Sequence, residues 1–346
     1  YDFSYGLADD NTSSRISAIL ESGRDETSGA VVTLPAQTFS YQASTGQFTE
    51  ATTNWQLPDI YFNRYYNGAD KGGRFVDVNG DSLQDLLIAY NDGATNDKRI
   101  FLNTGSGWSE TSAWTIPSDV WLSQSNERDT GWRIIDINGD SLPDLLRSYN
   151  TSYYADENSP ERDQRVYLNN GINGWDLQVG SWQLPLVYFS LVNGTDGGLQ
   201  INDINSDGLP DLFMAHYIPT NLSGPITDGR VYLNTGSGWA QSLAWVFPED
   251  FHISNYYNSK DQGTRLLDIN SDGLLDAVTN YEESPAVFKK RVYINTGSGW
   301  VIDSKWTLPD AAVFTNYNGR DSGWRAIDAN SDGRTDLVKS LLKSGI

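Results

Sequence analysis

The chain has 346 residues, no cysteine and a formal charge of −21. Lack of cysteine excludes disulfides, thiolate metal sites and thiol catalysis, and the negative charge excludes nucleic acid and acidic membrane surfaces as partners, because both require a basic surface. Hydrophobic residues make up 38% of the chain, and no apolar run reaches the roughly 18 residues of a membrane-spanning helix, so we expect no membrane insertion.

The first 54 residues are predicted to form a degenerate N-terminal blade or closure segment. Arg15 to Leu20 has the composition of a strand, and Phe39 to Gly46 (Phe-Ser-Tyr-Gln-Ala-Ser-Thr-Gly) resembles a strand that recurs later in the chain. Because the chain opens on Tyr1 and not on Met, we expect it to be a processed or excised portion of something longer.

From Trp55 onward the sequence repeats, and residues 55–346 are predicted to form one domain. Each repeat opens with Trp-x-apolar-Pro, and the metal-type motif within it recurs every 59 to 67 residues. A length that exceeds a usual single core is therefore reached by repetition, since each unit packs only on its neighbours. The predicted repeats are 55–113, 114–181, 182–244, 245–305 and 306–346.

Within each repeat lies the motif Asp-x-Asn-x-Asp-(Gly or Ser)-x-x-Asp, which we number as loop positions one to nine. Alternate hard-oxygen donors around a small residue allow a loop to curl around a cation, which predicts Ca²⁺ binding at about five sites per chain. The predicted ligands are the side chains at positions one, three, five and nine and the backbone carbonyl at position seven. They are Asp77, Asn79, Asp81, Leu83 and Asp85; Asp136, Asn138, Asp140, Leu142 and Asp144; Asp203, Asn205, Asp207, Leu209 and Asp211; Asp268, Asn270, Asp272, Leu274 and Asp276; and Asp328, Asn330, Asp332, Arg334 and Asp336.

The motif has two alternative interpretations, an EF-hand and a simple Asx-turn. An EF-hand requires a glutamate at loop position twelve and flanking helices, whereas that position holds Ile88 in the first copy and Arg147 in the second. Simple Asx-turns at hairpin tips are the second alternative. Turns alone, however, do not require four oxygen ligands at the same loop positions in all five copies. Three aspartates per motif account for 15 of the 45 acidic residues, so five divalent ions, adding ten positive charges, would bring the net charge to about −11.

An Asp and an Arg precede each motif at fixed spacing. The Asp lies seven residues before position one, and an Arg follows it by four residues in every repeat except the third, where Gln200 stands instead. We expect the two side chains to pair bidentately and to orient the loop, with the Arg stem packed on the adjacent Trp. Direct ligation of the cation by this Asp is the alternative. The pairs are Asp70 and Arg74, Asp129 and Arg133, Asp196 and Gln200, Asp261 and Arg265, and Asp321 and Arg325.

Short runs rich in Val, Ile, Tyr, Trp and Thr, broken by Gly, Asn, Asp and Ser, predict an all-β fold with four strands per repeat. Each repeat closes on a strand such as Arg-Val-Tyr-Leu-Asn-Thr-Gly-Ser-Gly-Trp at 230–239. Four-stranded units around a ring describe a β-propeller. We favour six blades, counting residues 1–54; five or seven are the alternatives. The recurrent Trp residues are expected to pack between blades in preference to stacking on sugars.

The Asp-x-Asn-x-Asp-Gly-x-x-Asp-Leu loops of residues 55–346 resemble the FG-GAP/VCBS repeats of calcium-binding propellers, which include the integrin α-subunit head. The Tyr-Leu-Asn-Thr-Gly-Ser-Gly-Trp strands, and Ser-Arg-Ile and Leu-Pro-Ala-Gln-Thr-Phe-Ser-Tyr in the first 48 residues, resemble the propeller region of Rhs/YD-repeat proteins and of the B component of Tc toxin complexes. This resemblance implies a propeller that caps or gates a shell of YD repeats and docks to a protein partner. Ser82 and Ser141 stand where the family prefers Gly.

The sequence favours a non-enzymatic function. Only His216 and His252 are present, at different repeat positions and without a recurring carboxylate partner or a nucleophile signature. We expect a calcium-stabilised structural and protein-docking module of a secreted or surface bacterial protein, whose partner is another protein or the rest of a larger polypeptide. The alternative is a glycan-binding lectin or adhesin that uses the tyrosine pairs at 65–66, 153–154 and 256–257; a polysaccharide lyase or hydrolase is the least favoured.

Overall fold

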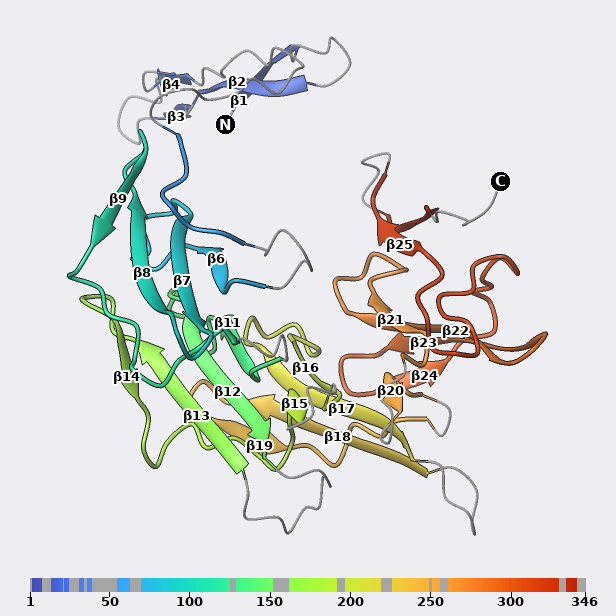
Figure 1. Cartoon of the computed structure of the whole chain (residues 1–346). Coiled ribbons are helices and arrows are strands. Elements are labelled where there is room, and N and C mark those ends of the chain that lie inside the picture. Colours follow the sequence, from blue (N-terminus) through green and yellow to red (C-terminus); the bar gives the residue numbers. More distant parts are fainter. Residues whose placement is uncertain are drawn as a thin grey trace, which may run out of the picture. The chain divides into compact units, whose positions relative to one another are not determined.

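The computed structural model divides the chain into two compact units, residues 1–56 and 57–346 (Figure 1). Every regular element in the described part of the chain is a β-strand, so this part contains no helix that is long and apolar enough to cross a membrane. The division lies two residues after the predicted end of the first segment. The structure describes residues 2–7, 14–20, 22–24, 31–33, 36–38, 55–62, 70–124, 129–151, 162–191, 197–218, 226–248, 251–255, 261–329 and 334–340.

The first unit contains one three-stranded sheet and one two-stranded sheet. In the larger sheet β2 lies between β1 and β5, and both pairings are antiparallel. The strand β2 covers the predicted 15–20 strand, whereas the predicted 39–46 strand lies outside the described residues. The strands are β1 (Asp2–Leu7), β2 (Ser14–Leu20), β3 (Ser22–Arg24), β4 (Val31–Thr33) and β5 (Gln37–Thr38).

The second unit repeats one antiparallel sheet of four strands, and the structure describes four such sheets and two strands of a fifth. The first consists of β6 (Gly73–Val76), β7 (Asp85–Asn91), β8 (Asn96–Asn103) and β9 (Trp108–Thr111). The second consists of β11 (Trp132–Ile135), β12 (Asp144–Asn150), β13 (Arg162–Asn169) and β14 (Trp175–Leu177). The third consists of β16 (Leu199–Asn202), β17 (Asp211–Ile218), β18 (Ile226–Asn234) and β19 (Trp239–Gln241). The fourth consists of β21 (Thr264–Leu267), β22 (Asp276–Ser284), β23 (Val287–Asn295) and β24 (Trp300–Ile302). The described part of the fifth contains β25 (Trp324–Ile327) and β26 (Asp336–Lys339).

These sheets are the blades of an all-β propeller fold, as the sequence predicts. The second strand of each of the four complete blades is the most deeply buried: in β7 all residues from Asp85 to Tyr90 are buried. Apolar residues occupy both of its faces, because Leu87 packs in the cluster shared with the second blade, whereas Leu86 and Ile88 pack with Ile60 and Phe101. The number of blades in a closed ring stays a prediction.

Successive blades are joined by a short strand that the following repeat adds to the preceding sheet. The strand β10 (Ser123–Gln124) pairs in parallel with the far end of β7, and β15 (Ser190–Leu191) and β20 (Ser254–Asn255) do the same on β12 and β17. The near half of each second strand pairs antiparallel with the first strand of its own blade. The inner edge of each of these three blades is thus shared between two repeats, which leaves less unpaired edge.

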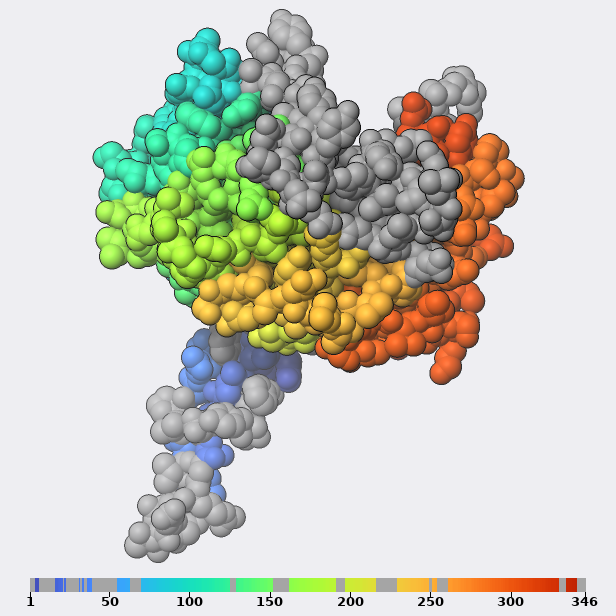
Figure 2. All heavy atoms as spheres, turned by 90° about the horizontal axis from the view of Figure 1, so that it is seen from below, coloured from blue at the N-terminus to red at the C-terminus, as the bar shows by residue number. Residues whose placement is uncertain are grey.

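Three of the five repeat-opening Trp residues are buried between blades, as predicted. The indole of Trp114 packs edge-on against Trp175 with ring centroids 6.0 Å apart, and the cluster around it joins Leu87 and Ile100 of the first blade to Leu145 of the second. Trp182 and Trp245 occupy the corresponding places at the next two junctions. Trp55 and Trp306 are 41% and 46% exposed. Successive repeats of the second unit touch one another in the space-filling view (Figure 2).

Candidate metal-binding loops

The five predicted loops all connect the first strand of a blade to its second strand, so that position nine is the first residue of the second strand. Four loops lie wholly within the described residues. In the fifth, Asn330 and Asp332 lie outside the described residues, whereas Asp328, Arg334 and Asp336 lie within them.

The carboxylate at position one folds the loop around itself. In the first loop, Asp77 Oδ2 accepts the backbone N–H of Ser82 at 2.7 Å and Oδ1 accepts that of Gly80 at 2.8 Å. The bond from position six recurs in the other three complete loops at 2.7–3.0 Å. This curl requires left-handed backbone at two positions, with φ of 75° at Gly80 and 69° at Ser82.

Positions three and five are linked to each other on the exposed side of the loop. Asn79 Nδ2 donates to Asp81 Oδ2 at 3.0 Å, and Asp81 Oδ1 accepts the N–H of Leu83 at 2.9 Å. The same pair of bonds is present in the other three complete loops. The side chains at positions three and five therefore lie together above the loop in all four complete copies.

The position-nine carboxylate is buried and clamps the loop to its blade. Asp144 is 0% exposed; its Oδ2 accepts the N–H of Ile137 at 3.0 Å, and its Oδ1 accepts that of Asn169 at 2.8 Å. The pKa of Asp144 is raised to about 7, chiefly by burial and in addition by the charges of Asp140 and Asp136, against the two hydrogen bonds that lower it. The pKa of Asp211 is raised to about 6 for the same reasons, and those of Asp85 and Asp276 are raised as well.

The donor set of each loop fits a hard divalent cation. The four side chains offer only oxygen ligands, and the carboxylates at positions one and five add to the effect of burial, which is the main cause of the raised pKa at position nine. Across the described ranges, however, no three or more His, Cys, Asp and Glu side chains are grouped so that they could hold a metal ion. Oxygens of the carboxylates face the loop's own N–H groups instead, so calcium binding stays a prediction.

One recurrent residue with a place in these loops was missed in the sequence. The Asn that ends the third strand of each blade donates its backbone N–H to the position-nine carboxylate of its own blade. In the second to fourth blades its side chain also reaches the loop of the preceding blade, where Nδ2 donates to the position-two carbonyl at 2.7–2.8 Å. Its recurrence before Thr-Gly-Ser-Gly or Asn-Gly-Ile-Asn-Gly was the only signal.

Three of the predicted Asp and Arg pairs are bidentate, and in a fourth Arg325 Nη1 lies 2.8 Å from Asp321 Oδ2. Arg74 Nη2 lies 2.6 Å from Asp70 Oδ2, and its Nη1 lies 3.1 Å from Oδ1; the pairs at 129/133 and 261/265 match this geometry. Because both Asp70 oxygens bond Arg74 and Oδ1 also accepts the N–H of Gly72, the pair fixes the turn before the first strand. Asp196 lies outside the described residues.

The guanidinium groups of two of these Arg residues lie over Phe rings, and the expected packing of the Arg stems on the adjacent Trp stays a prediction. The guanidinium of Arg133 lies 4.7 Å from the ring centroid of Phe189, and that of Arg265 lies 5.5 Å from that of Phe314. Both Phe residues come from the segment that leads into the following blade, so the Arg contributes to the junction.

Of the other predicted positions, the structure describes the surroundings of His252. The tyrosine pairs at 65–66, 153–154 and 256–257 lie outside the described residues. His252 is 4% exposed, which fits a packed residue better than a base that must reach a substrate.

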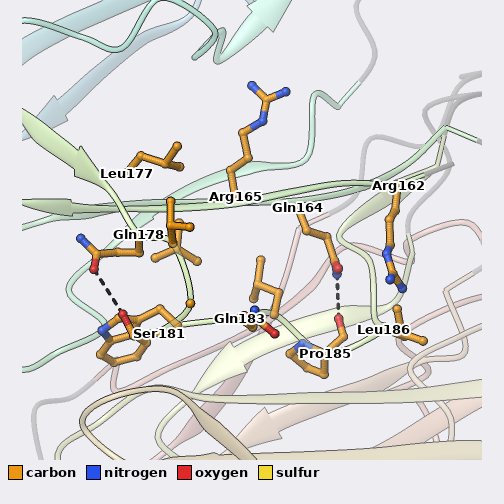
Figure 3. A pocket seen from close by; sticks show the side chains of 14 residues that line it. Arg162, Gln164, Arg165, Leu177, Gln178, Ser181, Gln183, Pro185 and Leu186 are labelled. Atoms are coloured by element: carbon orange, nitrogen blue, oxygen red, sulfur yellow. Dashed lines mark hydrogen bonds between the residues drawn. The ribbon is translucent and has the colours of Figure 1, made fainter. Parts of the chain in front are cut away.

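A separate polar groove of about 690 Å³ lies between the outer strands of the second blade and the segment that leads to the third (Figure 3). Arg162, Gln164, Gln178 and Gln183 line it, and Gln164 Nε2 donates to the Pro185 carbonyl at 2.7 Å. The connection from Trp175 to Trp182 is one residue longer than its counterparts, and Trp182 adopts a φ of 56°, which is rare for a bulky residue. The extra residue and this strained backbone coincide with the groove.

A comparison with known protein families agrees with the repeat. The FG-GAP-like repeat family matches residues 77–147 and 203–279. A solved lectin from Agrocybe aegerita, described by its recognition of non-reducing terminal N-acetylglucosamine, shares 16% identity with a TM-score of 0.47, over 77% of this chain and 59% of that one. The Photorhabdus luminescens Tc holotoxin pore shares 16% identity with a TM-score of 0.30, over 97% of this chain and 16% of that one.

A comparison with curated proteins found no match. The chain thus spans 59% and 16% of the lengths of the two solved structures. The matched segments contain the first and second loops and the third and fourth loops, each with its flanking strands. Residues 77–147 and 203–279 match FG-GAP-like repeats, and they fold as blades of a β-propeller.

Proposed function

We propose that this chain is a calcium-stabilised, non-enzymatic β-propeller module that serves as a structural platform for docking a protein partner. The observation that supports the proposal is the construction of the loops. Four complete loops present the same oxygen donors in the same hydrogen-bonded geometry, and each has a buried carboxylate at position nine that two other carboxylates repel. A bound cation would offset this repulsion in every blade.

The residues of each loop would contribute to cation binding in different ways. Positions one, three and five supply exposed oxygens, position nine supplies a buried carboxylate, and the left-handed residues at positions four and six give the loop its curl. Calcium accepts six to eight oxygen ligands in flexible geometry, whereas magnesium requires a stricter octahedron. Waters or a backbone carbonyl would complete the shell, so calcium is the better fit.

A secreted or surface location suits weak sites of this kind. Extracellular modules bind calcium with Kd on the order of 10⁻⁴–10⁻³ M, so transfer of the chain to a calcium-rich medium would complete its folding. We place the module in a bacterial protein of the toxin type, where the rest of a larger polypeptide or a separate protein would dock on it. The FG-GAP-like repeats and the sequence resemblance to Tc and Rhs proteins support this context.

Removal of divalent ions tests the proposal. We expect EDTA to lower the melting temperature by many degrees, because each site contributes about 2.7 kcal/mol at a hundredfold excess of calcium over Kd. Calcium should restore the melting temperature better than magnesium. Native mass spectrometry should count about five calcium ions per chain, one fewer in Asp81→Ala, and an unchanged number in the control Glu110→Ala, which alters an exposed acidic residue outside the loops. An identical melting curve with and without chelator would refute the proposal.

Carbohydrate binding is the second candidate, and the polar groove of the second blade favours it. Amide and guanidinium groups from Gln178, Gln183 and Arg162 are spread along the groove, which apolar Leu177 and Pro185 also line (Figure 3), and this is the mixture that sugar hydroxyls and ring faces require. A glycan array measures it: a saturable signal that Arg162→Ala abolishes, and that Arg291→Ala on another blade preserves, would support this function. The absence of any such signal would leave the docking role alone.

A further inference from the structure

The four complete loops are connected to one another through buried hydrogen bonds. The position-two carbonyl of one loop accepts from the Asn side chain of the next blade, and the same Asn donates its backbone N–H to the position-nine carboxylate of that next blade. At the first junction, Asn169 Nδ2 lies 2.8 Å from the Val78 carbonyl, and its N lies 2.8 Å from Asp144 Oδ1. One residue therefore holds two loops.

The connection continues without a break into the third and fourth blades. The other oxygen of Asp144 accepts the N–H of Ile137, whose carbonyl accepts from Asn234 Nδ2 at 2.7 Å. Asn234 donates its N–H to Asp211 at 2.7 Å, and the pattern repeats through Ile204, Asn295 and Asp276. The Asn and Asp members are at most 5% exposed, and Ile137 and Ile204 are 0% exposed.

Such a chain can transmit a local change because its members lack water as an alternative partner. A buried donor or acceptor that loses its partner costs about 1–3 kcal/mol, so movement of one carboxylate is resisted by the groups bonded to it. Position nine is both a predicted cation ligand and a member of this chain of bonds. Position two lies between the predicted ligands at positions one and three.

We propose that these buried Asn residues are positioning residues that couple cation binding between adjacent loops, so that the loops load cooperatively. The inference rests on the proposed calcium function and adds its regulation. A cation at one loop fixes the position-nine carboxylate, the carboxylate fixes the Asn backbone, and the Asn side chain fixes the loop of the preceding blade. The coupling is reciprocal, because each site must raise the affinity of its neighbour by the same factor.

The first blade supplies a matched control. Asn103 occupies the same strand position and donates its N–H to Asp85 at 2.7 Å, but the bond described for its Nδ2 is to the Gln84 carbonyl of its own blade. Asn234 makes the equivalent bond to its own blade, to the Pro210 carbonyl, in addition to the one across the junction. Asn103→Ala and Asn234→Ala therefore remove the same bonds within a blade, and only the second removes a bond between two blades.

Calcium titration of the full chain by calorimetry tests the coupling. We expect the parent to bind with a Hill coefficient above one, and Asn234→Ala to lower the coefficient and to weaken half-saturation by about fivefold or more, the lower end of usual coupling factors. Asn103→Ala should leave both unchanged. Five sites with a curve that Asn234→Ala does not alter would overturn the coupling alone, whereas a parent that binds no calcium would overturn the proposed function and the coupling together.

A second measurement applies if Asn234→Ala does not fold. Asp140→Asn and Asp81→Asn each disable one loop through an exposed side chain. The second loop has described neighbours on both sides, and the first has one on one side only. Cooperative loading predicts that Asp140→Asn weakens the remaining sites several-fold and Asp81→Asn weakens them less. Remaining sites with parental affinity in both variants would overturn the proposal.

Discussion

The first two loops and the next two have the same backbone geometry, although Gly and Ser are exchanged between positions four and six. Loops one and two read Asn-Gly-Asp-Ser-Leu, with Gly at position four and Ser at position six, and loops three and four read Asn-Ser-Asp-Gly-Leu. Positions four and six have positive φ in all four, from 58° at Ser206 to 87° at Gly208. The fold thus requires two left-handed residues per loop, but it does not fix which of them is Gly.

The neighbouring blade decides where the Gly is placed. A Cβ atom on Gly80 would lie 2.8 Å from Leu142 Cδ2 of the next loop, and one on Gly139 would lie 3.0 Å from Leu209 Cδ2. At the following junction Ser206 makes a different contact, since its hydroxyl donates to the Gly273 carbonyl of the next loop at 2.8 Å. A Cβ on Gly208 or Gly273 would meet nothing within 4 Å. A side chain at position four therefore faces the junction, whereas position six of the fourth loop contributes only its backbone carbonyl there.

Substitution of the two kinds of Gly should give the largest difference. Gly80→Ala combines the cost of a left-handed Ala, about 1–2 kcal/mol, with overlap against Leu142, which adds about 1 kcal/mol or more. Gly208→Ala has the backbone cost alone. We expect Gly80→Ala to lower the free energy of unfolding by about 2–3 kcal/mol and Gly208→Ala by about 1 kcal/mol, measured by urea denaturation.

A double variant isolates the overlap. Adding Leu142→Ala to Gly80→Ala removes the clashing methyl group, so the two losses should combine to about 1 kcal/mol less than their sum. Leu83→Ala is the control partner, because Leu83 lies near Gly105 of its own blade. Equal losses from Gly80→Ala and Gly208→Ala would show that the neighbouring blade does not decide the position of the Gly.

The sequence predicted the repeated parts of the molecule because repetition is visible along the chain. The loop positions, the strands and the burial of Trp114, Trp182 and Trp245 follow from patterns that recur once per repeat. Trp306 is exposed because the described part of its repeat lacks a closing strand that could supply a partner like Trp300. A position within a repeat thus predicts burial only where the adjoining strands are present.

Contacts between repeats could not be predicted in the same way. The Asn that ends the third strand recurs in four repeats. A pattern along the chain, however, does not show that its side chain bonds to the preceding blade. The exchange of Gly and Ser between positions four and six likewise could not be explained from the sequence, because its reason lies in contacts with the next loop. The pattern along the chain also did not show that each short loop offers its own N–H groups to the predicted ligand carboxylates.

The smallest expected effect comes from the hydroxyl at position four. Ser206→Ala keeps the left-handed backbone and a Cβ atom and removes only the bond to the Gly273 carbonyl, so it should cost about 1 kcal/mol. Ser82→Ala is the matched control, because Ser82 has a similar positive φ and lies exposed at position six of its loop; its cost should be within about 0.5 kcal/mol of zero. Unfolding in urea resolves a difference of this size when the two variants are compared side by side. If Ser206→Ala and Ser82→Ala unfold at the same denaturant concentration, the hydroxyl does not join the third and fourth loops, and position four matters for the junction only where it is Gly.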